Sequence, residues 1–207
     1  CGKILENEIR NANISAHCAF YDIDLRNVID ALSKKSKSAD VKIVLDNTNN
    51  DEQIKGSSVR FDDNNQLMHN KFCVIDKSTI ITGSFNPTDN DNNYNNNNIL
   101  IIHSKTLAEN YEDEFEELWN GKFGEGIKVK YPKLSLSGII IENYFCPEDE
   151  CASKVAGLIY NAEKSVYFMA FSFTNEEIAD AIIKKGKLDV KGIFDSGQAS
   201  SQYSQYK

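Results

Sequence analysis

Met68-His-Asn-Lys-Phe-Cys-Val-Ile-Asp76, followed by Thr82-Gly-Ser-Phe-Asn-Pro-Thr88, is the most informative stretch of this sequence. His69 and Lys71 are two residues apart at the start of an apolar run. Side chains alternate between the two faces of a strand, so both should point the same way. Ser84 and Asn86 repeat this spacing after the next short strand, where Gly83 permits close backbone approach. Two antiparallel strands would therefore bring an imidazole, an ammonium, a hydroxyl and an amide together.

This set of groups suits the chemistry of a phosphodiester. An imidazole can attack phosphorus or transfer a proton. An ammonium and neutral donors can hold the non-bridging oxygens as negative charge develops on them. This chemistry requires no metal and no cofactor. Because a lone His-x-Lys at a strand start occurs often by chance, the interpretation rests on the longer pattern.

The longer pattern is His69-x-Lys71-x-x-x-x-Asp76, then seven residues, then Ser84-x-Asn86. It resembles the phospholipase D superfamily, and its small endonuclease branch in particular. The resemblance implies an α/β fold, with a mixed sheet flanked by helices, and a metal-independent phosphodiesterase that forms a phosphohistidine. It makes His69 the nucleophile or general acid, and it assigns phosphate binding to Lys71 and Asn86 with help from Ser84. It also implies that two such motifs, from two repeats or from two chains of a homodimer, meet at one site.

Two further positions are interpreted through this pattern. Asp76 is seven residues beyond His69 and has the opposite strand parity, so we expect it to be structural. The family usually places a Glu after Asn86, hydrogen-bonded to the catalytic imidazole, and matching loop lengths puts Asn97 there. An amide oxygen can accept from a ring N–H but cannot stabilise an imidazolium as a carboxylate does. Either this repeat has lost activity, or another acid such as Asp91 replaces the Glu.

An internal repeat organises the chain. Residues 1–32 align with 151–182, and each copy continues to a short strand that ends at an Asp. Helix–strand–helix–strand alternation predicts α/β units with parallel pairing. We expect one nearly complete repeat at 1–120, a linker at 121–137, and the first half of a second repeat at 138–207. The second His-x-Lys would fall at about position 218, so the chain is interpreted as a piece of a two-repeat protein. The later strands of the first repeat are predicted at 71–75, 79–82 and 99–103, and a helix at 107–119.

Four polar residues outside the motif have competing interpretations. Asp46 and Asp195 end equivalent strands, where α/β clefts form, and they either rim a site or cap the next helix. We favour capping. His17 lies in an apolar run and is expected to pack rather than react, whereas His103 is expected at the surface.

The charge balance limits the choice of substrate. The net charge is −8, so the chain has no general attraction for nucleic acid or anionic lipid. Attraction to a phosphodiester must be local. Nucleic acid is the expected substrate. A phospholipid is the alternative, and it would need an apolar lipid-facing loop that the sequence does not indicate. A non-catalytic binding repeat is the third reading.

The five cysteines bear on the compartment. Cys18 and Cys73 lie in apolar runs and are expected to be buried small hydrophobic residues. Cys146 and Cys151 flank a turn and could close a local disulfide, which spacing alone leaves open. Such a disulfide would favour an extracytoplasmic location, and the sequence is otherwise silent on localisation.

Overall fold

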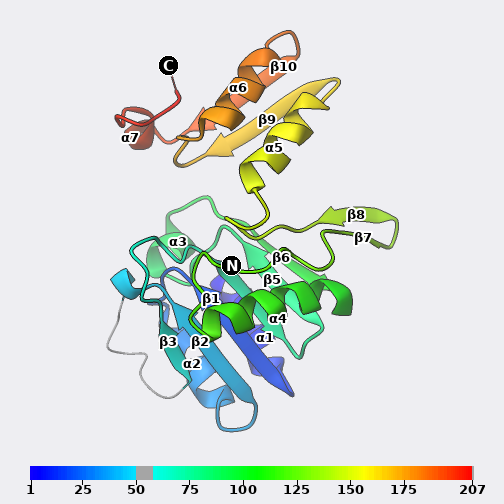
Figure 1. Ribbon diagram of the computed structural model, residues 1–207. Coiled ribbons are helices and arrows are strands. Elements are labelled where there is room, and N and C mark those ends of the chain that lie inside the picture. The colour runs from blue at the N-terminus through cyan, green and yellow to red at the C-terminus, as the bar shows by residue number, and fades with distance from the viewer. Residues whose placement is uncertain (50–57, 207) are drawn as a thin grey trace. The chain divides into compact units, whose positions relative to one another are not determined.

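The computed structural model describes residues 1–49 and 58–206 and divides into two compact units, Cys1–Asn143 and Tyr144–Lys207 (Figure 1). The division falls six residues later than the expected start of the second repeat. This is because a hairpin, β7 (Lys133–Leu136) paired with β8 (Ile139–Glu142), belongs to the first unit. Within the described residues, no helix is both long and apolar enough to cross a membrane.

The first unit is built on a six-stranded mixed sheet, which confirms the expected fold class. The strand order is β3-β2-β1-β4-β5-β6. The first three strands are parallel to one another, and β4, β5 and β6 each run antiparallel to the preceding neighbour in that order. Their bounds are β1 Ser15–Phe20, β2 Asp40–Leu45, β3 Val59–Phe61, β4 Lys71–Ile75, β5 Thr79–Gly83 and β6 Ile99–His103.

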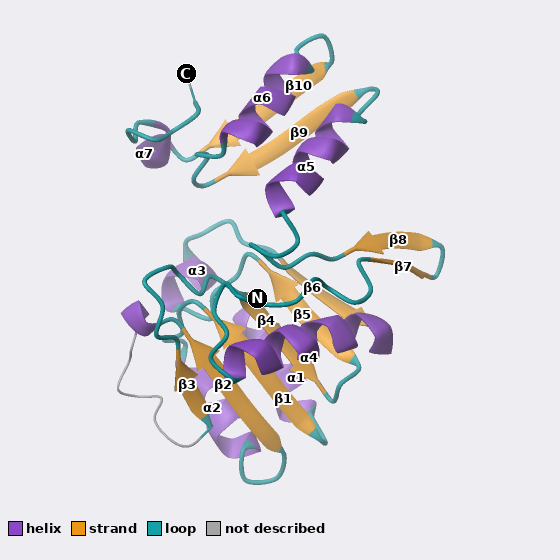
Figure 2. Ribbon diagram, viewed as in Figure 1, coloured by secondary structure: helices purple, strands orange, loops and turns teal. Residues whose placement is uncertain are grey.

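Helices cover both faces of this sheet (Figure 2). Helices α1 (Gly2–Asn11) and α2 (Arg26–Lys35) pack their apolar sides on one face, with Leu5, Ile9 and Val28 fully buried. Helix α4 (Lys105–Trp119) crosses the other face and contacts β1, β2, β4 and β5. All six residues of β1 are therefore buried, as expected for a strand covered on both sides.

Local sequence explains where these elements begin. Ser104 caps α4, because its hydroxyl accepts a hydrogen bond from the Leu107 N–H at 3.2 Å. The helix therefore starts two residues before the predicted position. A short helix, α3 (Asp89–Asn93), forms inside the Asn-rich segment expected to be a loop, and Thr88 caps it through the Asp91 N–H. A 3-10 turn, η1 (Asn47–Asn49), follows β2.

The second unit repeats the first four elements of the first. Its order is α5 (Cys151–Tyr160), β9 (Ser165–Ala170), α6 (Glu176–Lys184) and β10 (Asp189–Phe194), followed by α7 (Ser196–Ala199). Strands β9 and β10 pair in parallel, as β1 and β2 do. Asn175 caps α6 by accepting the Ile178 N–H at 3.0 Å, and Asp195 caps α7. The buried core of this unit is small and centres on Ala156, Ile159 and Ala181.

The cysteines correct one expectation. Cys18 and Cys73 are buried as predicted, but they form a disulfide with Cα atoms 4.1 Å apart. They face each other across the antiparallel β1–β4 pair, a register that sequence spacing does not reveal. Cys146 and Cys151 also form a disulfide, and Cys1 is free and exposed.

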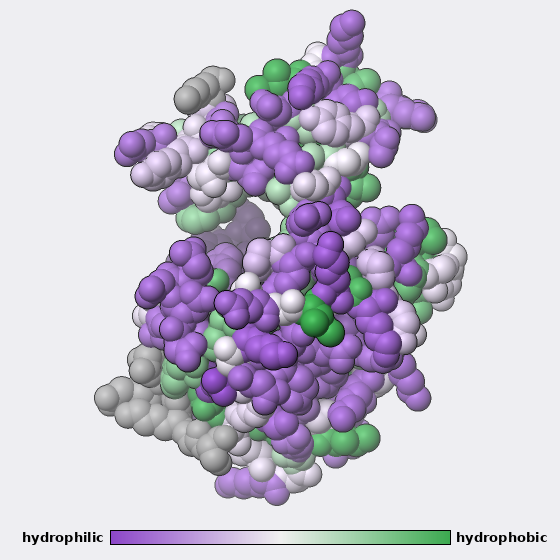
Figure 3. Space-filling view, in the orientation of Figure 1, coloured by the Kyte–Doolittle hydropathy of each residue, from purple (hydrophilic) through white to green (hydrophobic). Residues whose placement is uncertain are grey.

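The molecular surface reflects the charged composition. The face seen in Figure 3 is covered mainly by hydrophilic side chains, with apolar residues in small separate groups. This agrees with 26% charged residues in the chain.

Candidate active site

The polar groups of the motif gather at one end of the first sheet. Strand β4 runs antiparallel to β1, so its first residue, Lys71, pairs with Phe20 at the end of β1. The end of β5 lies beside the same point, because Phe72 pairs with Thr82. His69 just precedes β4, and Ser84 and Asn86 follow β5. The two-residue spacings thus place all four side chains at this end.

Tyr21, the residue after β1, joins His69 to Lys71. Its ring centroid is 4.8 Å from that of His69, and the Lys71 Nζ lies 5.3 Å from the centre of the same ring. The Lys71 ammonium also donates to the His69 carbonyl oxygen at 3.0 Å. Sequence reasoning missed Tyr21. The available signal was its position directly after a strand whose partner begins at Lys71.

The surroundings lower the pKa values of both His69 and Lys71. Burial lowers the pKa of Lys71 to about 8, although Asp91 and Asp22 oppose this. Burial and the Lys71 charge lower the pKa of His69, and Asp46 opposes them. At neutral pH the imidazole is therefore mainly neutral, as a nucleophile must be, while Lys71 is protonated in most molecules.

Asn86 is held by an acid rather than by the histidine. Its backbone N–H and its amide Nδ2 both donate to Asp91 Oδ2, at 2.7 and 3.0 Å. One N–H of the amide is thus committed, and an amide nitrogen carries two. Asp91, considered as a replacement for the missing Glu, bonds to Asn86, and its charge raises the pKa of Lys71 rather than that of His69.

Ser84 lies in the exposed turn after β5. Its hydroxyl oxygen accepts from the backbone N–H of Asn98 at 3.1 Å and from the Asn98 amide at 3.3 Å, which leaves its own hydrogen for another acceptor. Gly83 has φ +152°, and a Cβ there would collide with the Asn98 carbonyl oxygen. The close backbone approach expected at Gly83 is therefore present. Asn97 is half-buried and lies next to Asn98, before β6.

Asp76 sits at the other end of β4, away from His69. It has φ +51°, and its carboxylate accepts backbone N–H groups from Asn13, Ile14 and Ser15 at 2.6 to 3.0 Å. Burial alone would raise its pKa, but these hydrogen bonds outweigh burial and lower it. Its contacts join the β4–β5 turn to the start of β1.

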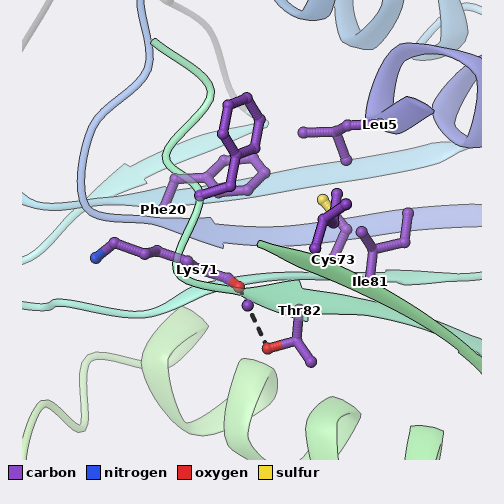
Figure 4. A pocket seen from close by; sticks show the side chains of 9 residues that line it. Leu5, Phe20, Lys71, Cys73, Ile81 and Thr82 are labelled. Carbon is purple, nitrogen blue, oxygen red and sulfur yellow. Dashed lines mark hydrogen bonds between the residues drawn. The ribbon is translucent and has the colours of Figure 1, made fainter. Parts of the chain in front are cut away.

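A small cavity beneath the site is a packing feature (Figure 4). The Lys71 ammonium points away from the apolar side chains around it, and Thr82 donates to the Lys71 carbonyl oxygen at 3.4 Å. The lining is mostly apolar and offers no polar set for a substrate: Leu5, Phe20, Lys71, Cys73, Ile81, Thr82, Gly83, Phe85 and Ile99.

A second polar cluster lies between α4 and the sheet. His17, only 3% exposed, stacks on Phe115, and its Nδ1 lies 2.7 Å from Glu112 Oε2. Its Nε2 lies 3.2 Å from Asp40 Oδ2. Possible metal-ligand atoms of His17, Glu112 and Glu116 lie within 4.8 Å of one another. The two hydrogen bonds already occupy the imidazole, so His17 packs and pairs as expected.

Comparison with known proteins establishes the family of this fold. The fold and the site define an α/β protein of the phospholipase D class. A family model described as "Cardiolipin synthase, PLD-like domain" matches residues 5–119, which is more than half of the chain. The chain therefore belongs to this PLD-like family, within the phospholipase D superfamily.

Two curated relatives show the extent of the similarity. Mitochondrial cardiolipin hydrolase of Xenopus tropicalis is 41% identical over 64 residues, 31% of this chain and 30% of that protein. A phospholipase D of Rickettsia conorii is 32% identical over 120 residues, 54% of this chain and 60% of that protein. The chain thus spans between 30% and 60% of the length of these relatives.

Solved structures support the same fold. Nuc of Salmonella typhimurium, a phospholipase D family member, aligns with TM-score 0.50 and 25% identity, over 57% of this chain and 86% of that one. Phosphatidylserine synthase of Haemophilus influenzae aligns with TM-score 0.62 over 93% of this chain and 59% of that one. At 12% identity, this second likeness concerns the fold alone.

Proposed function

We propose that this protein is a metal-independent phosphodiesterase that acts through a phosphohistidine on nucleic acid. The observation that carries the proposal is the pairing of His69 with Lys71. A lowered pKa favours the neutral imidazole, and the Lys71 ammonium donates to the His69 carbonyl oxygen at 3.0 Å and lies over the Tyr21 ring that also contacts the imidazole. A neutral imidazole beside a fixed cation is the arrangement needed for attack on an anionic phosphorus centre.

The reaction has two balanced steps. In the first, an imidazole nitrogen of His69 forms a bond to phosphorus while a P–O bond breaks, and the leaving oxygen takes a proton from a general acid. In the second, the deprotonated general acid takes a proton from water as the water oxygen attacks phosphorus, and the N–P bond breaks, which regenerates both the imidazole and the acid. The Lys71 ammonium, the remaining Asn86 N–H and the Ser84 O–H hold the non-bridging oxygens in both steps.

The general acid is proposed to be a second histidine. While the His69 ring attacks phosphorus, it cannot at the same moment protonate the leaving oxygen. A second copy of the chain, joined as a homodimer, or a second repeat would supply this group. We therefore expect a strictly monomeric 207-residue chain to be a poor catalyst, and activity per chain to rise with protein concentration. Robust turnover by a verified monomer would exclude this requirement.

Nucleic acid is preferred because the site is open and polar. Ser84 is exposed and the partly desolvated His69 reaches the surface, and Nuc aligns with 57% of this chain. A phospholipid is the second candidate, favoured by the identity to cardiolipin hydrolase and phospholipase D. Both substrate classes present the same phosphodiester to the same side chains.

One comparison separates these candidates. Labelled single-stranded DNA, single-stranded RNA and cardiolipin vesicles would each be incubated with the protein and with His69→Asn in EDTA. Cleavage of DNA or RNA that the variant lacks supports the proposal. Release of a lipid product alone would replace it with the lipid reading. Binding of nucleic acid without cleavage of any substrate would point to a non-catalytic repeat.

A further inference from the structure

A buried carboxylate supports the backbone that carries His69. Asp46, at the end of β2, is only 1% exposed. Its Oδ2 accepts the backbone N–H of Met68 at 2.8 Å, and its Oδ1 accepts the Thr48 N–H at 2.9 Å and the Thr48 hydroxyl. Asp46 therefore caps the turn that follows β2 through Oδ1, as predicted. Its Oδ2 accepts a hydrogen bond from the loop that precedes β4.

Met68 links this carboxylate directly to the catalytic residue. It immediately precedes His69, and its own side chain is buried at 5% exposure. With its N–H and its side chain both held, the peptide that leads into His69 has little freedom. A hydrogen bond from a charged acceptor is about twice as strong as a neutral one, which makes Asp46 an effective anchor.

Two charges and one aromatic ring surround His69. Lys71 on β4 disfavours a positive imidazole, whereas Asp46 on β2 favours it. Tyr21, after β1, contributes its ring. Asp62, also buried, accepts the Asn47 N–H on its Oδ1 at 2.8 Å and also interacts with the Met68 N–H. Among the groups that shift His69, the one carboxylate is thus Asp46, because Asp91 bonds to Asn86.

We propose that Asp46 is the positioning residue for His69. From the end of β2, it takes the role of the Glu that the family usually has at the position of Asn97. This rests on the proposed phosphohistidine function. A phosphorylated imidazole carries positive charge, so a fixed buried carboxylate stabilises the intermediate as well as the ring's orientation. The low-dielectric surroundings of Asp46 strengthen its effect.

The test uses Asp46→Asn, which keeps an oxygen for the Met68 N–H but removes the charge. Asp195→Asn is the matched control, because Asp195 ends the equivalent strand and caps α7 through the Gln198 N–H at 2.9 Å. The His69 pKa would be measured by NMR of the imidazole, assigned with His69→Asn, and kcat would be followed against pH. Circular dichroism would verify folding.

For Asp46→Asn we expect a lower His69 pKa. The acidic side of the plot of kcat against pH should move to lower pH by the same amount. The maximal kcat of this variant should fall roughly tenfold, the equivalent of about one pKa unit. The control should change neither quantity. An unchanged His69 pKa in folded Asp46→Asn, or a shifted pKa with full kcat, overturns the proposal. If a verified dimer of the parent has no activity, the proposed function fails, while the NMR comparison still decides whether Asp46 acts on His69.

Discussion

Asp91 accepts two hydrogen bonds from Asn86 on a single carboxylate oxygen, at 2.7 Å from the backbone N–H and 3.0 Å from the side-chain amide. The same carboxylate raises the pKa of Lys71. One acid therefore orients the Asn86 amide and also favours the cationic form of Lys71, the two groups proposed to bind phosphate. Its place at the first turn of α3 explains why the Asn-rich segment folds into a helix there.

Replacing Asp91 should impair substrate binding more than folding. Asp91→Ala frees the Asn86 side-chain amide, and the loss of this one charge-assisted hydrogen bond corresponds to about 1.5–3 kcal/mol. We expect kcat/KM to fall roughly tenfold to a hundredfold. Asp91→Asn is the matched variant, since it retains an acceptor and should lose less. Steady-state kinetics on a phosphodiester would show this order, and equal losses in both variants would contradict it.

Lys71 should set the alkaline limit of activity. With a pKa of about 8, its ammonium loses its proton as the pH rises beyond that value, and attraction for an anionic substrate is lost with it. From the fraction protonated, we expect kcat/KM at pH 9 to be roughly a tenth of its plateau. Lys71→Arg keeps its charge, so its alkaline limb should disappear even if its maximal rate is lower. A pH profile that is flat through pH 9 in the parent would rule out this role.

His17 should make stability depend on pH. Burial alone would lower the His17 pKa, but Glu112 and Asp40 outweigh burial and raise it above 6.5. A raised folded-state pKa means that this stabilisation is complete below the unfolded value and declines as the pH rises through the folded value. The parent should therefore lose stability above about pH 6.5.

The test variant for this pH dependence is His17→Gln, and His103→Gln is its control. The first leaves Glu112 partly buried without its cation and should lower the free energy of unfolding at pH 6 by roughly 3 kcal/mol. The second alters an exposed histidine that lies 3.0 Å from the Thr79 hydroxyl, and it should change stability little. Urea denaturation at pH 6 and pH 8 would reveal the difference. A His17→Gln effect of the same size at both pH values would refute the charged pair.

The thiol count tests the cysteine pairing. Of five cysteines, four are paired and Cys1 is free. Unreduced denatured protein should therefore react with one equivalent of a thiol reagent, and five after reduction. Cleavage of the Cys18–Cys73 bond should lower stability, because it closes a loop of 55 residues. Three or more reactive thiols before reduction would show that a pair is absent.

The sequence predicted the fold well where patterns are local. The strands predicted at 71–75, 79–82 and 99–103 correspond to β4, β5 and β6, and the helical stripe that ends at Trp119 corresponds to α4. Contacts that depend on strand pairing were not predictable in the same way. Tyr21 reaches His69, and Cys18 reaches Cys73, only because β1 pairs with β4 in one register.

The hydrogen-bond partners of Asp46 and Asp91 were likewise not predictable from the sequence. Asp46 was expected to be a helix cap, and it is one. Its second carboxylate oxygen also accepts a hydrogen bond from Met68, which is 22 residues away in sequence. Asp91 was considered as a partner for the imidazole and instead bonds to Asn86. In both cases the residue type and its strand-end or loop position were visible in the sequence. The partner was decided by packing between segments that no local pattern connects.

The most direct test of the phosphohistidine account is hydrolysis of bis-p-nitrophenyl phosphate in the presence of EDTA, comparing the parent with His69→Asn. The account predicts that EDTA leaves the parent's activity intact and that the variant, although folded, loses it. Activity that EDTA abolishes, activity that survives in His69→Asn, or no hydrolysis by a parent sample verified to be dimeric would each contradict it.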